Sequence, residues 1–292
     1  MTLKIMTDSA ADIPARLLKE YDLSIVPTVI RFGEEIYYEN VNLTIDQFYE
    51  KFSSSEEYPQ TANPTLSDQY ELIKKLGKEA DEVLNVVISS AVSGSYNTAL
   101  NAKRMYEKRE ASPAKIHIFD SKMATFAIGI IAIKAAEMIK DGASTNEIVK
   151  SLEKYRNSLE VGFTVANLKY LHRGGRLSRS KYWIAQIADM KPVINFIDGK
   201  MDVVKTVRGH ENAVLESFNT IFEKKGKPEK FNAYIMHSRN EESANLLKEY
   251  IETEIQPKEY NISIKPLGMT IVTHTGPGYI GICLDTEYKF IE

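Results

Sequence analysis

A turn rich in small hydroxyl side chains lies in the first half of the chain. Ser93, Gly94 and Ser95 follow the β-branched run 86–88, and a helical spacing of apolar residues extends over 97–108. A strand that enters a helix through such a turn presents free backbone N–H groups and the positive end of the helix dipole. This arrangement is typical of an anion-binding site. The simpler interpretation of this stretch alone is that Ser93 or Ser95 caps the helix.

Two arginines flank a double glycine in the motif Arg173–Gly174–Gly175–Arg176. Glycine permits positive φ angles and a close approach of the backbone. The planar guanidinium group of arginine donates two parallel hydrogen bonds to a carboxylate or a phosphate. The motif therefore indicates an anion site. The alternative interpretation is that it ends a helix and that both arginines are solvated.

A second loop is expected at Thr273–Gly278, where His274 stands between two threonines and Gly-Pro-Gly forms a tight turn. Imidazole has a reference pKa of about 6.5, so it can donate to an anion or transfer a proton. A lone histidine is more often structural. A hydrolytic triad of Ser93, His274 and Asp8 or Asp120 stays open as an alternative, because triads are defined by geometry and not by order.

The elements that must position these residues alternate between strand and helix in the first half. Polar turns follow three expected strands, and ligands bind outside the carboxyl ends of strands in such sheets. The strands are expected at Leu3–Met6, Val83–Ile88 and Lys115–Phe119, and a hairpin around Gly33 at 23–32 and 35–38. One helix is expected to begin at Pro14 and another behind a cap at Ser121. Further helices are expected at 44–52, 67–76, 97–108 and 145–159, and a loop is expected at 59–65.

The second half has a different pattern. An Asp198–Gly199 turn predicts a hairpin between 193–197 and 201–207. Further strands are expected at 161–165, 231–236, 262–267 and 280–284, and helices at 167–172, 181–188, 211–223 and 241–253. The predicted fold class is α/β with two domains. Residues 1–159 form a mostly parallel α/β/α sandwich with a hairpin insertion near 23–40, and residues 160–292 form an α+β domain with a mixed or antiparallel sheet.

Composition excludes several classes of protein. The chain has 292 residues, a net charge of −3 and one cysteine, so we expect neither a nucleic-acid-binding surface nor an intrachain disulfide. The single cysteine and the lack of a signal peptide predict a cytoplasmic location. The most apolar segment, 123–139, contains Lys134 and Glu137 and predicts a buried core helix rather than a membrane span. Phosphate-loop, dinucleotide and zinc motifs are missing from the sequence, so no metal or cofactor is expected.

Taken together, the motifs resemble the DegV family, whose members include the fatty-acid-binding FakB subunits of bacterial fatty acid kinase. The resemblance rests on an ordered set that covers nearly the whole chain. Its pieces are Thr7–Pro14, Gln60–Thr65, Ile88–Asn97, Phe119–Lys122, Tyr170–Ser178 and His274–Gly278. The chain has Ala62 and Asn63 where serine and glutamine are commoner in the family, and Ser95 where threonine is usual.

The resemblance implies a long-chain fatty acid held between two domains, with the second domain lining an apolar tunnel. It implies that a separate ATP-binding kinase subunit phosphorylates the bound carboxylate. The implied carboxylate-binding residues are Thr61, Ser93, Gly94, Ser95, His274 and Thr275. Arg173 and His274 would lie at the mouth and support phosphoryl transfer.

A basic rim for an acidic kinase surface is a further hypothesis, with Arg173, Arg176 and Arg208 as its candidate residues. Two other functions stay open at this point. One is a serine hydrolase that acts on acyl esters through Ser93 and His274. The other is a lipid sensor that docks on another protein without phosphoryl transfer.

Overall fold

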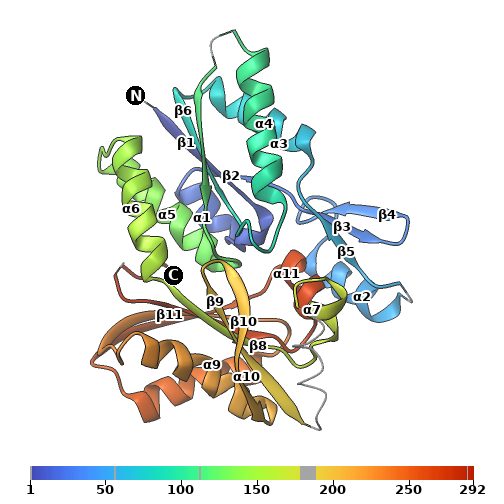
Figure 1. Ribbon diagram of the computed structural model, residues 1–292, viewed down its shortest axis with the longest axis vertical. Helices are drawn as coiled ribbons and strands as arrows, with labels where there is room; N and C mark the ends of the chain where they lie inside the picture. The colour runs from blue at the N-terminus through green and yellow to red at the C-terminus, as the bar shows by residue number, and fades with distance from the viewer. Residues whose placement is uncertain (1, 56, 112, 178–188, 288) are drawn as a thin grey trace. The chain divides into compact units, whose positions relative to one another are not determined.

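The computed structural model describes residues 2–55, 57–111, 113–177, 189–287 and 289–292 (Figure 1). The described chain divides into two compact units. The N-terminal unit comprises Met1–Arg156 and the C-terminal unit comprises Asn157–Glu292. The predicted fold class is confirmed, because one unit holds a parallel sheet and the other a mixed, largely antiparallel sheet.

The N-terminal unit is built on a parallel sheet with the strand order β2-β1-β6-β7. Helices α3 and α4 lie on one side of this sheet and α5 on the other (Figure 1). The strands are β1 Leu3–Asp8, β2 Leu23–Val26, β6 Glu82–Val87 and β7 Lys115–Asp120. The helices are α1 Ala15–Glu20, α3 Leu66–Gly77, α4 Ser95–Arg109, α5 Phe126–Lys140 and α6 Thr145–Ser158, with the short 3-10 helix η1 at Ser9–Ala11.

Apolar spacing explains both sides of the parallel sheet. Tyr70, Ile73 and Leu76 of α3 pack with Ala102 and Tyr106 of α4 on a core cluster of the sheet. Almost every residue of α5 up to Ala136 is buried, so the apolar segment is a core helix as expected. Alternation of buried strands and amphipathic helices therefore accounts for this layer structure.

A three-stranded antiparallel sheet projects from the N-terminal unit as an insertion. Its strands are β3 Val29–Phe32, β4 Glu35–Tyr38 and β5 Gln60–Ala62, in the order β4-β3-β5, and α2 Ile45–Ser54 belongs to the same insertion. A capping box begins α2, because Thr44 Oγ1 accepts from the N–H of Gln47 at 3.3 Å and Gln47 Oε1 accepts from the N–H of Thr44 at 2.9 Å.

Three local expectations were wrong in this unit. Residues 23–26 form β2 of the parallel sheet, so the hairpin is limited to β3 and β4. Residues 60–62 are a strand rather than a loop, because they pair with β3. Ser121 does not cap α5. Its Oγ instead accepts from the N–H of Met123 at 3.1 Å, and the helix begins behind Thr125, which has a φ of 59°.

The C-terminal unit is a six-stranded sheet with the order β10-β9-β8-β13-β11-β12. Strands β11 and β12 are parallel, and the other neighbours are antiparallel. The strands are β8 Glu160–Thr164, β9 Met190–Ile197, β10 Lys200–Arg208, β11 Lys230–His237, β12 Glu259–Pro266 and β13 Ile280–Asp285. The helices are α7 Lys169–Arg173, α9 His210–Lys224, α10 Glu241–Tyr250 and α11 Met269–Thr275, with a π-helical turn η2 at Ile251–Ile255.

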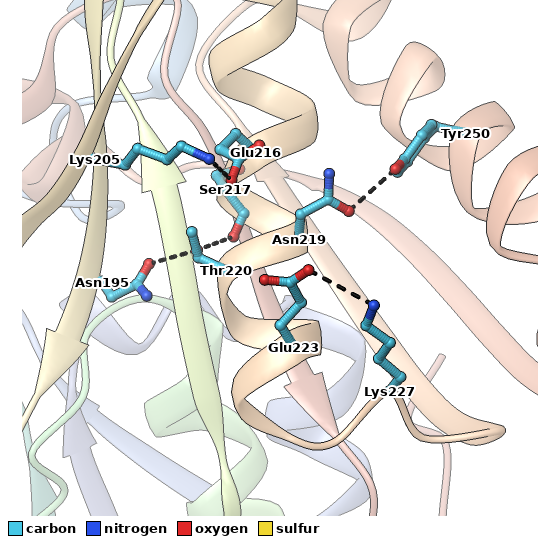
Figure 2. A network of polar contacts seen from close by, with 9 residues as sticks. All are labelled: Asn195, Lys205, Glu216, Ser217, Asn219, Thr220, Glu223, Lys227 and Tyr250. Carbon is cyan, nitrogen blue, oxygen red and sulfur yellow. Dashed lines mark hydrogen bonds and ion pairs between the residues drawn. The ribbon is translucent and has the colours of Figure 1, made fainter.

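Helix α9 packs across this sheet through both apolar and polar contacts. Phe218 and Ile221 lie in the core cluster, and Thr220 Oγ1 donates to Asn195 Oδ1 of β9 at 3.2 Å (Figure 2). Lys205 Nζ of β10 donates to Glu216 Oε1 of α9 at 2.7 Å. The predicted hairpin of β9 and β10 across Asp198–Gly199 is confirmed. The helix expected at 181–188 lies outside the described residues.

Candidate functional site

The carboxyl ends of β1 and β6 meet at a buried carboxyl group, as the parallel sheet predicts. Asp8 ends β1, and its Oδ2 accepts from the N–H of Ile88, which follows β6, at 3.4 Å. Its Oδ1 accepts from the N–H of Ala10 at 3.1 Å. Burial raises the pKa of Asp8 to about 7, although these two N–H groups oppose the rise.

A second buried carboxyl group lies next to this strand end. Ser9 Oγ donates to Glu39 Oε2 at 2.6 Å and accepts from the N–H of Thr28 at 2.9 Å. Ser9 therefore ties the insertion that carries Glu39 to the end of β1. Sequence reasoning did not identify Glu39 or Thr28, because only the tertiary path of the chain brings them to Ser9.

The turn after β6 presents the hydroxyl groups that the sequence singled out. Ser93 Oγ donates to Asn63 Oδ1 at 3.0 Å, lies 3.1 Å from Ser95 Oγ, and accepts from the N–H of Ser95 at 3.2 Å. Helix α4 begins at Ser95 behind Gly94, and the Ser93 hydroxyl accepts from the N–H of that first helical residue, so Ser93 also satisfies the end of the helix as the simpler interpretation expected. The turn thus places two hydroxyl groups at the N-terminal end of a 15-residue helix.

Gly94 allows the loop after β5 to lie against this turn. A Cβ atom on Gly94 would lie 2.5 Å from Asn63 Nδ2. Thr61 lies two residues before Asn63 and pairs with Ile30 in the small antiparallel sheet. The structure therefore brings the Thr61–Asn63 segment and the Ser93 turn together. Asn63 was missed as a partner of Ser93, and its only sequence signal was the departure from the family pattern.

The turn after β7 is held by its own carboxylate. Asp120 accepts from Ser90 Oγ at 2.5 Å, from the N–H of Ser90 at 3.2 Å, and from the N–H of Lys122 at 2.9 Å. These bonds join the turns after β6 and β7. They engage the Asp120 carboxylate in local structure, which disfavours it as the third member of a triad.

In the C-terminal unit, His274 lies in the last turn of α11 and not in a loop as expected. A Cβ atom on Gly174 would lie 2.5 Å from His274 Nδ1, so the glycine lets the end of α7 approach α11. Burial, with a smaller effect of the Arg176 charge, lowers the pKa of His274 to about 4. The imidazole is therefore neutral at neutral pH, where it serves better as a hydrogen-bond donor than as a general base.

The two arginines of the glycine motif differ in their surroundings. Arg173 is exposed, whereas Arg176 is half-buried and donates from Nη1 to the carbonyl of Gly174. Burial lowers the pKa of Arg176. Arg208 ends β10 and is exposed. Arg173 and Arg208 thus present charge to solvent, while the guanidinium group of Arg176 faces the corner of α7 and α11.

Thr275 is buried, and its Oγ1 donates to the carbonyl of Ile271 at 2.9 Å. The hydroxyl proton of Thr275 is therefore engaged within α11. The next residue, Gly276, has a φ of +74°, and a Cβ atom there would lie 2.3 Å from the ring of Tyr170. Glycine is required at this position because the backbone contacts an aromatic ring while it turns.

The described residues contain neither a metal-binding cluster nor a membrane-spanning helix. No group of three or more His, Cys, Asp or Glu side chains in these ranges could hold a metal ion. Within the same ranges, no helix is long and apolar enough to cross a bilayer.

Comparison with known proteins identifies similar chains over almost the full length. Residues 2–287 match a family model described as "Uncharacterised protein, DegV family". Protein DegV of Bacillus subtilis is 32% identical over 97% of this chain and 99% of its own length. A structure from Thermus thermophilus, titled as fatty acid binding of a DegV family protein, has a TM-score of 0.87 and 25% identity over 98% of this chain and 100% of that one. The crystal structure of DegV from Bacillus subtilis, titled as a fatty acid binding protein, has a TM-score of 0.84 and 30% identity over 98% of this chain and 100% of that one.

Proposed function

The chain belongs to the DegV family, and from that premise we propose that it binds a long-chain fatty acid and presents the carboxylate to a separate kinase subunit. The kinase subunit would supply ATP and form the acyl phosphate, as in a FakB-type system. The observation that carries the proposal is the pair of hydroxyl groups, Ser93 and Ser95, at the start of α4. The fatty acid binding named for the similar Thermus and Bacillus structures supports it.

The head group is assigned to the Ser93 turn. A carboxylate would replace Asn63 Oδ1 as the acceptor of the Ser93 hydroxyl, while the start of α4 favours the negative charge. Ser95 and Thr61 are the neighbouring hydroxyl donors, and the backbone of Gly94 completes the turn. A hydrogen bond to a charged acceptor contributes about 1.5–3 kcal/mol.

The apolar tail accounts for most of the affinity in this proposal. About fifteen methylene groups at roughly 0.8 kcal/mol each give about 12 kcal/mol before the costs of association. Those costs are on the order of 4–15 kcal/mol. The hydroxyl turn therefore sets the orientation of the ligand more than the strength of binding.

Arg173 and His274 are assigned to the phosphoryl-transfer step rather than to binding. Phosphoryl transfer depends on positioning and on stabilisation of charge. The neutral imidazole of His274 can donate one hydrogen bond to an oxygen of the phosphoryl group during transfer, and the exposed Arg173 can accompany the same incoming group. No resident cofactor is invoked, and the bound fatty acid is the only ligand proposed for a cytoplasmic carrier of this kind.

Solvent extraction of the purified protein, followed by mass spectrometry, tests the binding step. We expect a long-chain acyl species in the extract, and binding of added oleate or palmitate to protein stripped of lipid. Ser93→Ala should weaken oleate binding about tenfold, which corresponds to the loss of one hydrogen bond to a charged group. Ser53→Ala is the matched control, because Ser53 only bonds carbonyl groups within α2. The proposal fails if no acyl species is recovered and neither fatty acid binds.

His274→Ala tests the division of roles. This variant should keep its oleate affinity within about twofold, because His274 is assigned to the phosphoryl group and not to the bound carboxylate. It should lose most acyl-phosphate formation when a fatty acid kinase subunit and ATP are added. Acyl phosphate is measured as the hydroxamate after trapping with hydroxylamine. Equal loss of oleate binding in Ser93→Ala and His274→Ala would contradict the assignment. Binding without any acyl phosphate in the unmodified protein would favour a lipid sensor.

A serine hydrolase is disfavoured by the chemistry of its required base. A pKa of about 4 makes the imidazole of His274 a weak base for Ser93 at neutral pH. Turnover of a chromogenic acyl ester that is abolished by Ser93→Ala would revive this alternative.

A further inference from the structure

The end of β11 is tied to the loop that follows α11 by one fully buried residue, Ser238. Its hydroxyl group donates to the carbonyl of Gly276 at 2.8 Å and accepts from the N–H of Tyr279 at 2.9 Å. Its backbone N–H donates to the carbonyl of Tyr279 at 3.1 Å, and its carbonyl accepts from the N–H of Gly278 at 3.0 Å. All four bonds therefore reach the segment 276–279.

That segment fixes the end of the helix that carries His274. The N–H of Gly276 donates to the carbonyl of Val272 at 2.7 Å and ends α11. Gly276 also lies against the ring of Tyr170, and Gly278 lies against Ala166. The last turn of α11 is thus held from one side by the α7 region and from the other by Ser238.

We propose that Ser238 is a positioning residue for His274. Its hydroxyl group fixes the segment 276–279 and thereby holds the imidazole against Gly174 and beside Arg176. Removal of the hydroxyl group deprives the Gly276 carbonyl and the Tyr279 N–H of a hydrogen-bond partner. Because the site is buried, these polar groups require such a partner. The effect on phosphoryl transfer rests on the proposed function, whereas the positioning itself does not.

The titration of His274, followed by NMR of the histidine ring, tests the positioning without lipid or kinase. The chain has five histidines, and the signal that disappears in His274→Gln assigns the resonance. Burial and the Arg176 charge hold the pKa of His274 near 4. Ser238→Ala should loosen this environment and move the midpoint toward the ordinary value by about one pH unit.

Ser217→Ala is the matched control, because Ser217 is a fully buried serine of the same unit whose hydroxyl group donates to the Val214 carbonyl of its own helix at 2.7 Å. It should leave the His274 titration unchanged. If Ser238→Ala does not fold, Ser238→Cys keeps the shape with a weaker donor and should shift the midpoint in the same direction by less. An unshifted His274 midpoint in the folded Ser238 variant overturns the proposal.

The kinetic measurement is separate. With a kinase subunit and ATP, Ser238→Ala should lower kcat for acyl-phosphate formation about tenfold and leave the Kd for oleate unchanged. A shifted His274 midpoint with an unchanged kcat would support the positioning and contradict the role of His274 in the proposed function. An unshifted midpoint would contradict the positioning whatever the kinase assay gives.

Discussion

At the scale of single residues, the buried carboxyl group of Asp8 gives a testable pH dependence. Burial raises the pKa of Asp8 from an ordinary 3.8 to about 7 in the folded chain. The folded state therefore keeps a proton between pH 4 and 7 that the unfolded state has released. The stabilisation is complete below about pH 4 and is lost as the pH rises through 7, at about 1.4 kcal/mol per pH unit.

Asp8→Asn removes this dependence because an amide does not titrate. We expect the free energy of unfolding of the unmodified chain, relative to Asp8→Asn, to fall steadily from pH 4 to 7 and to level off above pH 8. Urea unfolding at several pH values measures the difference. Asp198→Asn, at an exposed turn position, is the control and should follow the unmodified chain. Parallel curves for Asp8→Asn and the unmodified chain would show that Asp8 titrates normally.

Residue chemistry was predictable where it depends on the local sequence. The Ser93 turn lies at the carboxyl end of β6 because the strand–turn–helix pattern dictates that position. The hydrogen bond between Ser93 and Asn63 was not predictable, because it depends on how closely the segment after β5 approaches the turn at Gly94. The loss of basicity at His274 likewise follows from burial beside Gly174, which spacing along the chain does not reveal.

At the scale of elements, the contact of α9 with the central strands depends on one small residue. A Cβ atom on Gly162 of β8 would lie 2.1 Å from the carbonyl oxygen of Ser217 in α9. Gly162→Ala should lower the free energy of unfolding by about 3 kcal/mol, because backbone atoms on both sides must move apart. Chemical denaturation followed by circular dichroism measures the loss.

The matched control lies on the exposed side of the same helix. Glu223 and Lys227 form an ion pair at 3.7 Å in which both side chains are 65% exposed, so Glu223→Ala should change stability by less than about 0.5 kcal/mol (Figure 2). Equal effects of Gly162→Ala and Glu223→Ala would contradict the close packing of α9 on β8.

Elements with strong periodicity were predicted well, and those fixed by tertiary pairing were not. The helices α2, α3 and α9 and the β9–β10 hairpin follow from spacing, caps and the Asp198–Gly199 turn. Strand β5 has three residues and exists only because β3 pairs with it. Helix α11 was missed because its seven residues end at a Gly-Pro-Gly run, which indicates a loop.

At the scale of the whole molecule, each unit follows a different topological rule. The N-terminal unit is a parallel sheet covered by helices, which places its polar turns at the carboxyl ends of β1, β6 and β7. The C-terminal unit is largely antiparallel, and its polar motifs lie instead on α7 and α11, outside the strands. The fold class was therefore predictable from the order of elements. The position of His274 was not, because it depends on where the mixed sheet of the C-terminal unit places α11.

In the proposed function, the surface charge of the whole molecule governs the association with a kinase subunit. Arg208 ends β10 and is exposed, whereas Arg176 donates to the Gly174 carbonyl, so Arg208 is the better probe of the proposed basic rim. Arg208→Glu should slow association with an acidic kinase surface about tenfold, because electrostatic steering acts mainly on the rate of association. It should leave oleate affinity unchanged.

Lys200→Glu is the matched control, because it makes the same charge change at the other end of the same strand. The two positions are about 27 Å apart along β10, which exceeds the screening length of about 8 Å at physiological salt. Association rates measured by stopped flow between 50 and 300 mM salt, roughly the range over which screening changes most, should show a weaker salt dependence for Arg208→Glu than for Lys200→Glu. Equal association rates for the two variants would place the kinase contact away from the end of β10.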